Sequence, residues 1–217
     1  MAIDTSLAAF LNKARIAIDG SLNHSEIQSY LSQYGYTLER LQGGKSLYEK
    51  AFAAHEKQKK EFGEQIDATA EFKKVWEEAQ KNYMRYVKIA RIAFKDKPGI
   101  FTELALNGKR KRSFSGWLLQ ASQFYSNLLG EQQRLEAMGN YGITPELLTA
   151  GQADLEAVQT ANISQQKEKG DAQAAREIRD EAIDNLDDWL SDFIAIAKIA
   201  LEEKPQLMES LGILARS

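Results

Sequence analysis

The stretch that decides the fold is FIAIAKIALEEKP at residues 193–205, because a close copy of it, YVKIARIAFKDKP, occupies residues 86–98. In both copies, apolar residues recur every three and four positions on two adjacent stripes. This pattern is typical of a helix that is buried against several neighbours. Both copies also end in the same Lys-Pro pair, which predicts the end of the helix, and a short further helix is expected after each proline.

The match extends well beyond these two segments when the chain is shifted along itself, without a gap, so that Tyr86 aligns with Phe193. In this alignment, called the repeat register below, YGYT at residues 34–37 aligns with YGIT at residues 141–144. Gly44 and Gly63 align with Gly151 and Gly170. Glycine and proline positions are not dictated by amphipathicity. Their recurrence therefore predicts an internal tandem duplication.

The composition favours an all-α fold, since Ala, Leu, Glu, Lys and Gln are abundant and the 217 residues include only 3 Pro. We predict a tandem duplication, without gaps, of a four-to-five-helix up-and-down bundle unit, packed with pseudo-two-fold symmetry. The expected domains are residues 1–108 and 109–217, with a linker at residues 109–112 at the start of the second. The pattern leaves open whether the repeats form separate bundles or one merged bundle.

Several residues predict where helices begin, turn or pack closely. Thr144 followed by Pro145 is typical of a helix start, and Thr37 holds the same place in the first repeat. Gly63 and Gly170 predict a turn into a further helix, with a kinked continuous helix as the alternative.

Glycines also interrupt or end apolar helical segments in both repeats. Gly44 and Gly151 lie inside a narrow apolar stripe, which predicts a neighbouring helix close to the backbone. Gly35 and Gly142 follow a tyrosine at the end of a short helix, where a positive φ is expected.

The overall charge and the absence of cysteine exclude several kinds of site. The net charge of -3 and the pI of about 5.6 give no global electrostatic argument for nucleic acid or anionic membrane as a partner. With no cysteine, disulfides, thiolate metal sites and thiol nucleophiles are excluded. No leader-like segment and no apolar run of about 20 residues occurs, so we expect a soluble, cytoplasmic protein without a membrane span.

One basic run stands out against the acidic background: Lys109, Arg110, Lys111 and Arg112. These residues are candidates for contact with an anion or a partner, such as phosphates or an anionic lipid surface. The neighbouring sequence supplies no exposed aromatic ladder. We therefore interpret the run as a charged connector between the repeats rather than a nucleic-acid site.

The candidate metal ligands are weak. Asp184, Asp188 and Asp192 lie at a spacing of four and share one helix face, where several carboxylate oxygens could attract a divalent cation. The corresponding positions of the first repeat include Lys81 and Arg85, so a solvated face is the favoured interpretation. The two histidines, His24 and His55, are not part of a Glu-x-x-His pattern.

No catalytic pattern is found: the sequence contains no Gly-rich phosphate loop after a strand and no recognisable nucleophile turn. We therefore predict a protein that is not an enzyme, needs no cofactor and acts as a helical interaction or scaffold protein through a protein partner or self-association. The alternative is a carrier of a small apolar ligand or lipid in a cavity between helices, lined by Trp and Tyr side chains. The third hypothesis is anion or nucleic-acid contact through residues 109–112.

Overall fold

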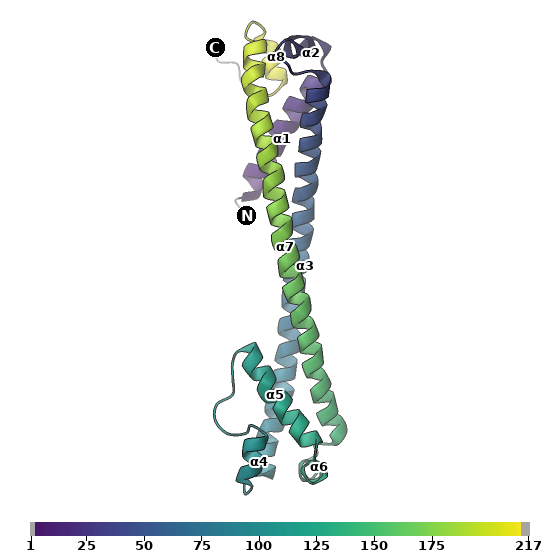
Figure 1. The fold of residues 1–217 in the computed structure, drawn as a ribbon, viewed down its shortest axis with the longest axis vertical. Helices are drawn as coiled ribbons and strands as arrows, with labels where there is room; N and C mark the ends of the chain where they lie inside the picture. The colour runs from purple at the N-terminus through teal and green to yellow at the C-terminus, as the bar shows by residue number, and fades with distance from the viewer. Residues whose placement is uncertain (1–2, 214–217) are drawn as a thin grey trace. The chain divides into compact units, whose positions relative to one another are not determined.

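The computed structural model describes the backbone of residues 3–213 and the side chains of residues 6–213. Its regular structure in this range is entirely helical, which confirms the predicted all-α class (Figure 1). The helices are α1 (Ile3–Leu22), α2 (Ser25–Ser32), α3 (Leu38–Ala93), α4 (Pro98–Glu103), α5 (Phe114–Leu129), α6 (Gln132–Gly139), α7 (Pro145–Ala200) and α8 (Pro205–Ser210). Of the described helices, none is both long and apolar enough to cross a membrane.

The chain divides into two compact units, and each contains residues from both predicted repeats. Unit 1 combines the chain up to Gly63 with the chain from Gly170 onward, and unit 2 runs from Glu64 to Lys169. These units and the predicted domains 1–108 and 109–217 are different divisions of the chain. The long helices α3 and α7 each contribute one part to unit 1 and the other part to unit 2.

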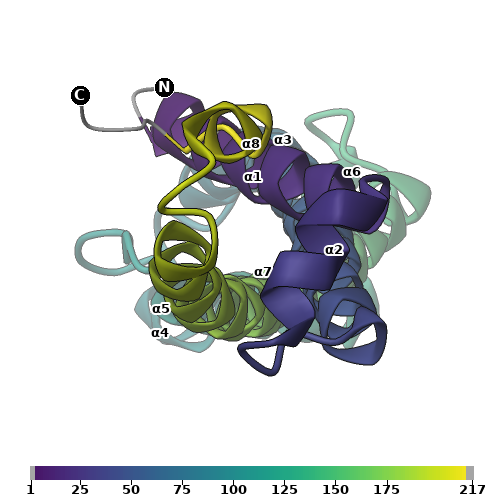
Figure 2. The same ribbon diagram turned by 90° about the horizontal axis from the view of Figure 1, so that it is seen from above.

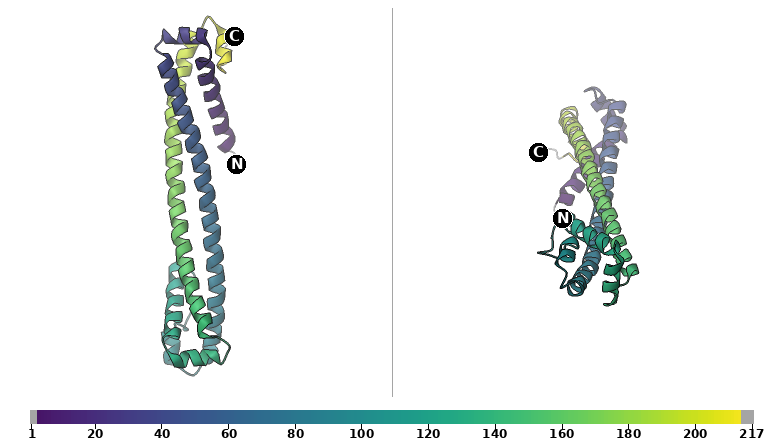
Figure 3. Two further views of the ribbon diagram at one scale, coloured as in Figure 1. Left: turned by 90° about the vertical axis from the view of Figure 1, so that its right-hand side faces the viewer. Right: turned by 60° about the horizontal axis from the view of Figure 1, so that its bottom comes forward.

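In unit 1, α1 lies beside the first part of α3 and the last part of α7, and α2 and α8 lie at the same end (Figures 1 and 2). In unit 2, α5 occupies the place that α1 has in unit 1, with α4 and α6 at the end (Figures 1 and 3). The short helix at the end of each predicted repeat packs on a helix of the other predicted repeat, since α8 contacts α1 and α4 contacts α5.

Both units have an apolar core, and the two cores follow the repeat register. Leu186, Leu190 and Phe193 in the core of unit 1 align with Ala79, Tyr83 and Tyr86 in the core of unit 2. The helix bounds follow it as well, because the first and last residues of α2, α3 and α4 align with those of α6, α7 and α8. The predicted core helix therefore contributes one buried face to the core of each unit.

The threonines that were predicted to start the long helices do so. The Thr37 hydroxyl accepts a hydrogen bond from the Arg40 backbone N–H at 3.3 Å, and the Thr144 hydroxyl accepts one from Leu147 at 3.4 Å. These contacts satisfy N–H groups that have no partner within the helix. Hydrogen bonding to Thr144 also holds the pKa of Glu146 below its ordinary value.

The predicted turn at Gly63 and Gly170 is wrong. Both glycines lie inside continuous helices of 56 residues, α3 and α7. A glycine costs about 1 kcal/mol in a helix interior, but the residues around it are mostly strong helix formers such as Glu, Gln, Lys and Ala, and no proline follows it.

The predicted helix ends at the Lys-Pro pairs are also shifted. Helix α3 ends at Ala93 and α7 ends at Ala200, several residues before the prolines. Pro98 and Pro205 instead begin α4 and α8. A proline suits this place because its missing N–H would have no partner in the first turn of a helix.

The glycines in the apolar stripe are in close contact with aromatic rings, as their position predicted. A Cβ atom on Gly44 would lie 2.3 Å from the ring of Trp189 on α7, within unit 1. A Cβ atom on Gly151 would lie 2.6 Å from the ring of Tyr125 on α5, within unit 2. Any larger residue at either position would have to displace a ring.

The turn after α4 contains a strained alanine, and we expect Ala105→Gly to raise the free energy of unfolding by about 1 kcal/mol. Ala105 has a φ of 50°, whereas the same place after α8 holds Gly212 with a φ of 69°. Both turns are closed by the same hydrogen bonds, including Leu106 N–H to Phe101 C=O at 2.7 Å. Urea unfolding of the two proteins would measure the difference.

Gly212→Ala is the matched control for that prediction. It places a Cβ atom 3.3 Å from Cγ2 of Ile16 in addition to the backbone strain, so its unfolding free energy should fall. If Ala105→Gly were neutral or destabilising, the turn after α4 would not hold the left-handed conformation in solution.

Candidate functional site

The basic run at residues 109–112 is attached to unit 2 rather than free. Arg110 donates to the Tyr83 hydroxyl at 3.0 Å and to the Asn107 carbonyl at 2.8 Å. The Lys111 backbone N–H donates to the Gln120 side chain at 2.9 Å. Arg110 therefore fixes the connector to α3.

A second arginine supports the same connector. Arg91 on α3 donates to the Leu106 carbonyl through Nη2 at 2.8 Å and through Nε at 3.2 Å. Lys109, Lys111 and Arg112 are exposed, so of the four candidate anion contacts these three face solvent while Arg110 is half-buried. The contacts of Arg110 and Lys111 give the run a structural role in unit 2.

The acidic candidates lie on the surface of α7 in unit 1. Asp184, Asp188 and Asp192 are all exposed. The structure does not bring their carboxylates together as a group of metal ligands within the described residues. The favoured interpretation of this row as a solvated face agrees with these positions.

The two histidines serve different places in unit 1. His24 is the residue before α2, and its Nδ1 accepts a hydrogen bond from the Ile27 backbone N–H at 3.4 Å. His55 is 9% exposed and borders a groove of about 500 Å³ between α1 and α3. His24 therefore has a capping role that the sequence did not predict.

The aromatic side chains of α3 that were considered as a ligand cavity pack on other rings of unit 2. Trp76 lies 5.9 Å from Trp117 and 5.4 Å from Phe114, measured between ring centroids. Tyr83 meets Phe124 edge to face at 5.4 Å. Offset and edge-to-face pairs of this kind stabilise a core beyond their buried area.

Two tyrosines of this core predict a loss of stability at alkaline pH. Burial raises the pKa of Tyr83 and Tyr125 above the ordinary value of 10.0, and the Arg110 guanidinium only partly opposes the shift at Tyr83. A pKa raised by folding gives stability that is complete below the unfolded value and is lost as the pH rises through the folded value.

We therefore expect the free energy of unfolding to fall above about pH 10, by up to about 1.4 kcal/mol per pH unit for each tyrosine that ionises only after unfolding. Urea unfolding at several pH values, with tyrosinate absorbance as a second readout, measures this slope. The Tyr83→Phe and Tyr125→Phe variants should flatten it. An unchanged slope in both variants would contradict the assignment to these residues.

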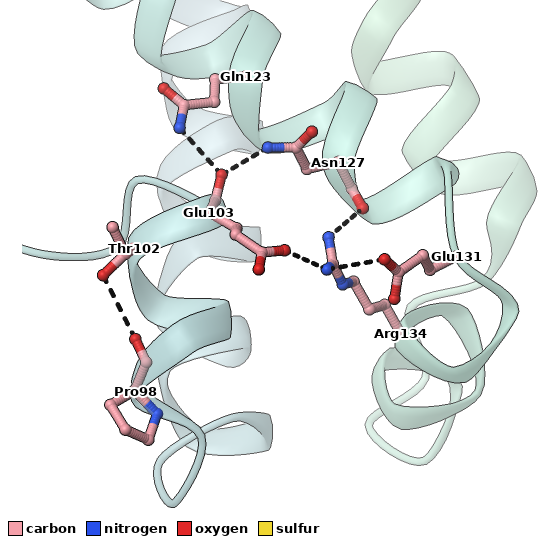
Figure 4. Close-up of polar contacts among 7 residues, drawn as sticks. All are labelled: Pro98, Thr102, Glu103, Gln123, Asn127, Glu131 and Arg134. Atoms are coloured by element: carbon pink, nitrogen blue, oxygen red, sulfur yellow. Dashed lines mark hydrogen bonds and ion pairs between the residues drawn. The ribbon is translucent and has the colours of Figure 1, made fainter.

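A buried arginine connects three helices of unit 2 (Figure 4). Arg134 on α6 has a side chain only 7% exposed, and its guanidinium contacts the carboxylates of Glu103 and Glu131. Its Nη1 donates to the Asn127 carbonyl of α5 at 2.9 Å. The Glu103 backbone carbonyl in turn accepts hydrogen bonds from Gln123 and Asn127. Sequence reasoning missed this network.

A groove of about 480 Å³ lies between α3 and α7 in unit 1. Its apolar lining comes from both helices at helical spacing: Leu47, Ala53, Ala54, Ile178 and Ala182. Its polar lining differs in charge between the two helices: α3 contributes Lys50 and Lys57, and α7 contributes Glu181 and Asn185.

The corresponding positions of unit 2 carry different residues. In the repeat register, Leu47 aligns with Asp154 and Ile178 aligns with Glu71, so two apolar groove residues have charged counterparts. Asp154 accepts a hydrogen bond from Asn82 at 3.2 Å. This contrast is visible in the repeat alignment and could have identified the groove from sequence.

Comparison of the chain with protein family models, with curated proteins and with solved structures finds no match.

Proposed function

We propose that this protein is a non-catalytic helical interaction or scaffold protein. The observation that carries the proposal is the number of large apolar side chains that the two bundles leave in water. Leu119 on α5 and Ile163 on α7 are 71% and 69% exposed, although both lie on helices with buried apolar faces. Apolar side chains that gather into a contiguous exposed surface are used by proteins that bind other proteins.

Large apolar side chains are also exposed at positions of the two units that align in the repeat register. Ile92 and Ile199 align in the repeat register and are both more than half exposed. Tyr34 and Tyr141 also align, and both are about half exposed. In both units, these positions hold side chains that contribute little to the core. Their recurrence supports a role at the surface.

We also propose that the chain arose by tandem duplication, with the two repeats, residues 1–108 and 109–217, related by approximate two-fold symmetry. The shared register of the helix bounds, the core positions and the closely packed glycines supports this proposal. A duplicated scaffold can present two related surfaces, which suits a protein that brings partners together or associates with itself.

The proposal is tested by measuring association of the full chain and of a Leu119→Gln, Ile163→Gln variant. Sedimentation equilibrium reports self-association, and cross-linking of purified protein added to cell extract reports partners. We expect the full chain to form a complex, and the Leu119→Gln, Ile163→Gln variant to form it more weakly. A control variant, Glu71→Gln with Glu78→Gln on the polar surface of α3, should form the complex as the natural protein does. A protein that remains monomeric and forms no cross-link sensitive to the first variant would contradict the proposal.

A further inference from the structure

The groove between α3 and α7 in unit 1 has the lining of a helix-binding surface. Leu47, Ala54 and Ile178 line it, with Leu47 and Ala54 seven residues apart on α3. This spacing equals two turns, so the lining follows the helix axis for about 10 Å. Small alanine side chains in the lining would let another backbone come close, as in packing of an amphipathic helix into a groove.

The fold does not require this groove to be apolar. At the corresponding positions of unit 2, Asp154 replaces Leu47 and Glu71 replaces Ile178, and the compact unit still forms around its own core. Ile178 is 51% exposed, so it adds little to the core of unit 1. The Ile178 side chain is therefore available for contact with another molecule.

The charges along the groove indicate which charges a bound helix should carry. Lys50 and Lys57 on α3 lie two turns apart, and no ion pair to either is found among the described residues. On the α7 side, the groove presents Glu181 and the neutral Asn185. A helix with acidic side chains along one flank could therefore pair with both lysines while its apolar face covers Leu47 and Ile178.

We propose that this groove binds an amphipathic helix of a partner protein, and that the flank of this helix beside Lys50 and Lys57 is acidic. The inference rests on the proposed interaction function and specifies its surface and the chemistry of the partner. Electrostatic complementarity then fixes which way round the helix lies, because Glu181 disfavours an acidic residue on the other flank.

The test uses two labelled synthetic helical peptides with the same Leu and Ala stripe, one with a Glu flank and one with a Lys flank. Fluorescence anisotropy with the full chain should show saturable binding of the Glu peptide and about ten-fold weaker binding of the Lys peptide. Equal binding of both peptides, or no saturable binding of the Glu peptide, would overturn the assignment.

Two sets of variants locate the binding. Ile178→Glu introduces the acidic residue of unit 2 at a side chain that is 51% exposed, so the fold should tolerate it, and we expect about ten-fold weaker binding of the Glu peptide. Lys50→Glu with Lys57→Glu should reverse the preference in favour of the Lys peptide. The matched control, Lys74→Glu with Lys81→Glu, makes the same charge change at the same spacing on α3 in unit 2 and should leave binding unchanged.

Other occupants give different results in the same assays. Dodecanoate that displaces the Glu peptide and binds more tightly would overturn the proposal in favour of an anionic amphiphile. Self-association that is lost in the Ile178→Glu variant would overturn it in favour of a second copy of the chain. Absence of peptide binding with cross-links still sensitive to Leu119→Gln and Ile163→Gln would reject this groove and leave the proposed function intact.

Discussion

Replacing Gly44 by alanine is expected to lower the free energy of unfolding by about 3 kcal/mol, at the upper end of what overpacking costs. The added Cβ atom would lie 2.3 Å from two atoms of the Trp189 ring, which is far inside van der Waals contact. The ring has little room to move, because it stacks on Phe193 at a centroid distance of 5.2 Å and meets Tyr36 edge to face at 5.9 Å.

The adjacent glycine supplies the control for this variant. Gly43 lies on the same helix, and a Cβ atom there would meet nothing within 4 Å. Gly43→Ala should therefore raise the unfolding free energy by up to about 1 kcal/mol through better helix propensity. Equilibrium unfolding in urea measures both variants, and equal effects of the two substitutions would show that Trp189 does not lie against Gly44 in solution.

A double variant separates the ring contact from other effects of the alanine. Trp189→Leu removes the ring, so Gly44→Ala should cost much less in that background than in the natural sequence. The same reasoning applies to Gly151→Ala, because Gly151 faces the ring of the fully buried Tyr125. Its control is Gly170→Ala on the same helix, where a Cβ atom would meet nothing within 4 Å.

The local features of this fold were largely predictable because each depends on a few neighbouring residues. Thr144 and Pro145 start a helix through their own chemistry, and Gly142 takes a φ of 77° where a positive value was expected. Gly44 and Gly151 were predicted to be approached closely because a glycine inside an apolar stripe costs stability unless something fills its space.

The division into units was not predictable in the same way. Periodicity shows which face of a helix is apolar but not which helix covers it. Once α3 continues through Gly63, the segment after it cannot fold back on the segment before it. Its apolar face is instead covered by α5, which belongs to the other predicted repeat, as the contact of Trp76 with Trp117 shows.

The candidate sites depend even more on tertiary contacts. Arg110 belonged to the basic run, and only the structure shows that its guanidinium is held by the Tyr83 hydroxyl. The burial of Arg134 was not predicted. The residue that aligns with it in the repeat register is Ile27, which is fully buried. A charged residue aligned with an apolar core residue is the signal that could have found it.

Removing both acidic partners of Arg134 is the second change expected to have a large effect. Glu103→Ala combined with Glu131→Ala should lower the unfolding free energy by about 3 kcal/mol, because it leaves a guanidinium 7% exposed without a counter-charge. Alanine at residue 131 removes no helix cap, since the Glu131 side chain makes no capping hydrogen bond to α6.

Removing the arginine itself should cost less, although it breaks both carboxylate contacts and the hydrogen bond to the Asn127 carbonyl. Glu103 and Glu131 have side chains 54% and 58% exposed, so water can solvate their carboxylates once Arg134 is gone. Arg134→Ile supplies the residue that unit 1 carries at the corresponding position and keeps apolar contact. We expect a loss of about 1 kcal/mol, mainly from the Asn127 carbonyl that loses its donor.

A simple count of broken contacts would give the larger loss to Arg134→Ile, because this change also removes the hydrogen bond to the Asn127 carbonyl. In the Arg134→Ile background, adding Glu103→Ala and Glu131→Ala should cost almost nothing, since no buried charge remains to be left unpaired. Urea unfolding of the natural protein and the three variants completes the cycle. If Arg134→Ile proved as costly as the double alanine variant, the guanidinium would not be buried as the structure places it, and the contact between α4, α5 and α6 would depend on something else.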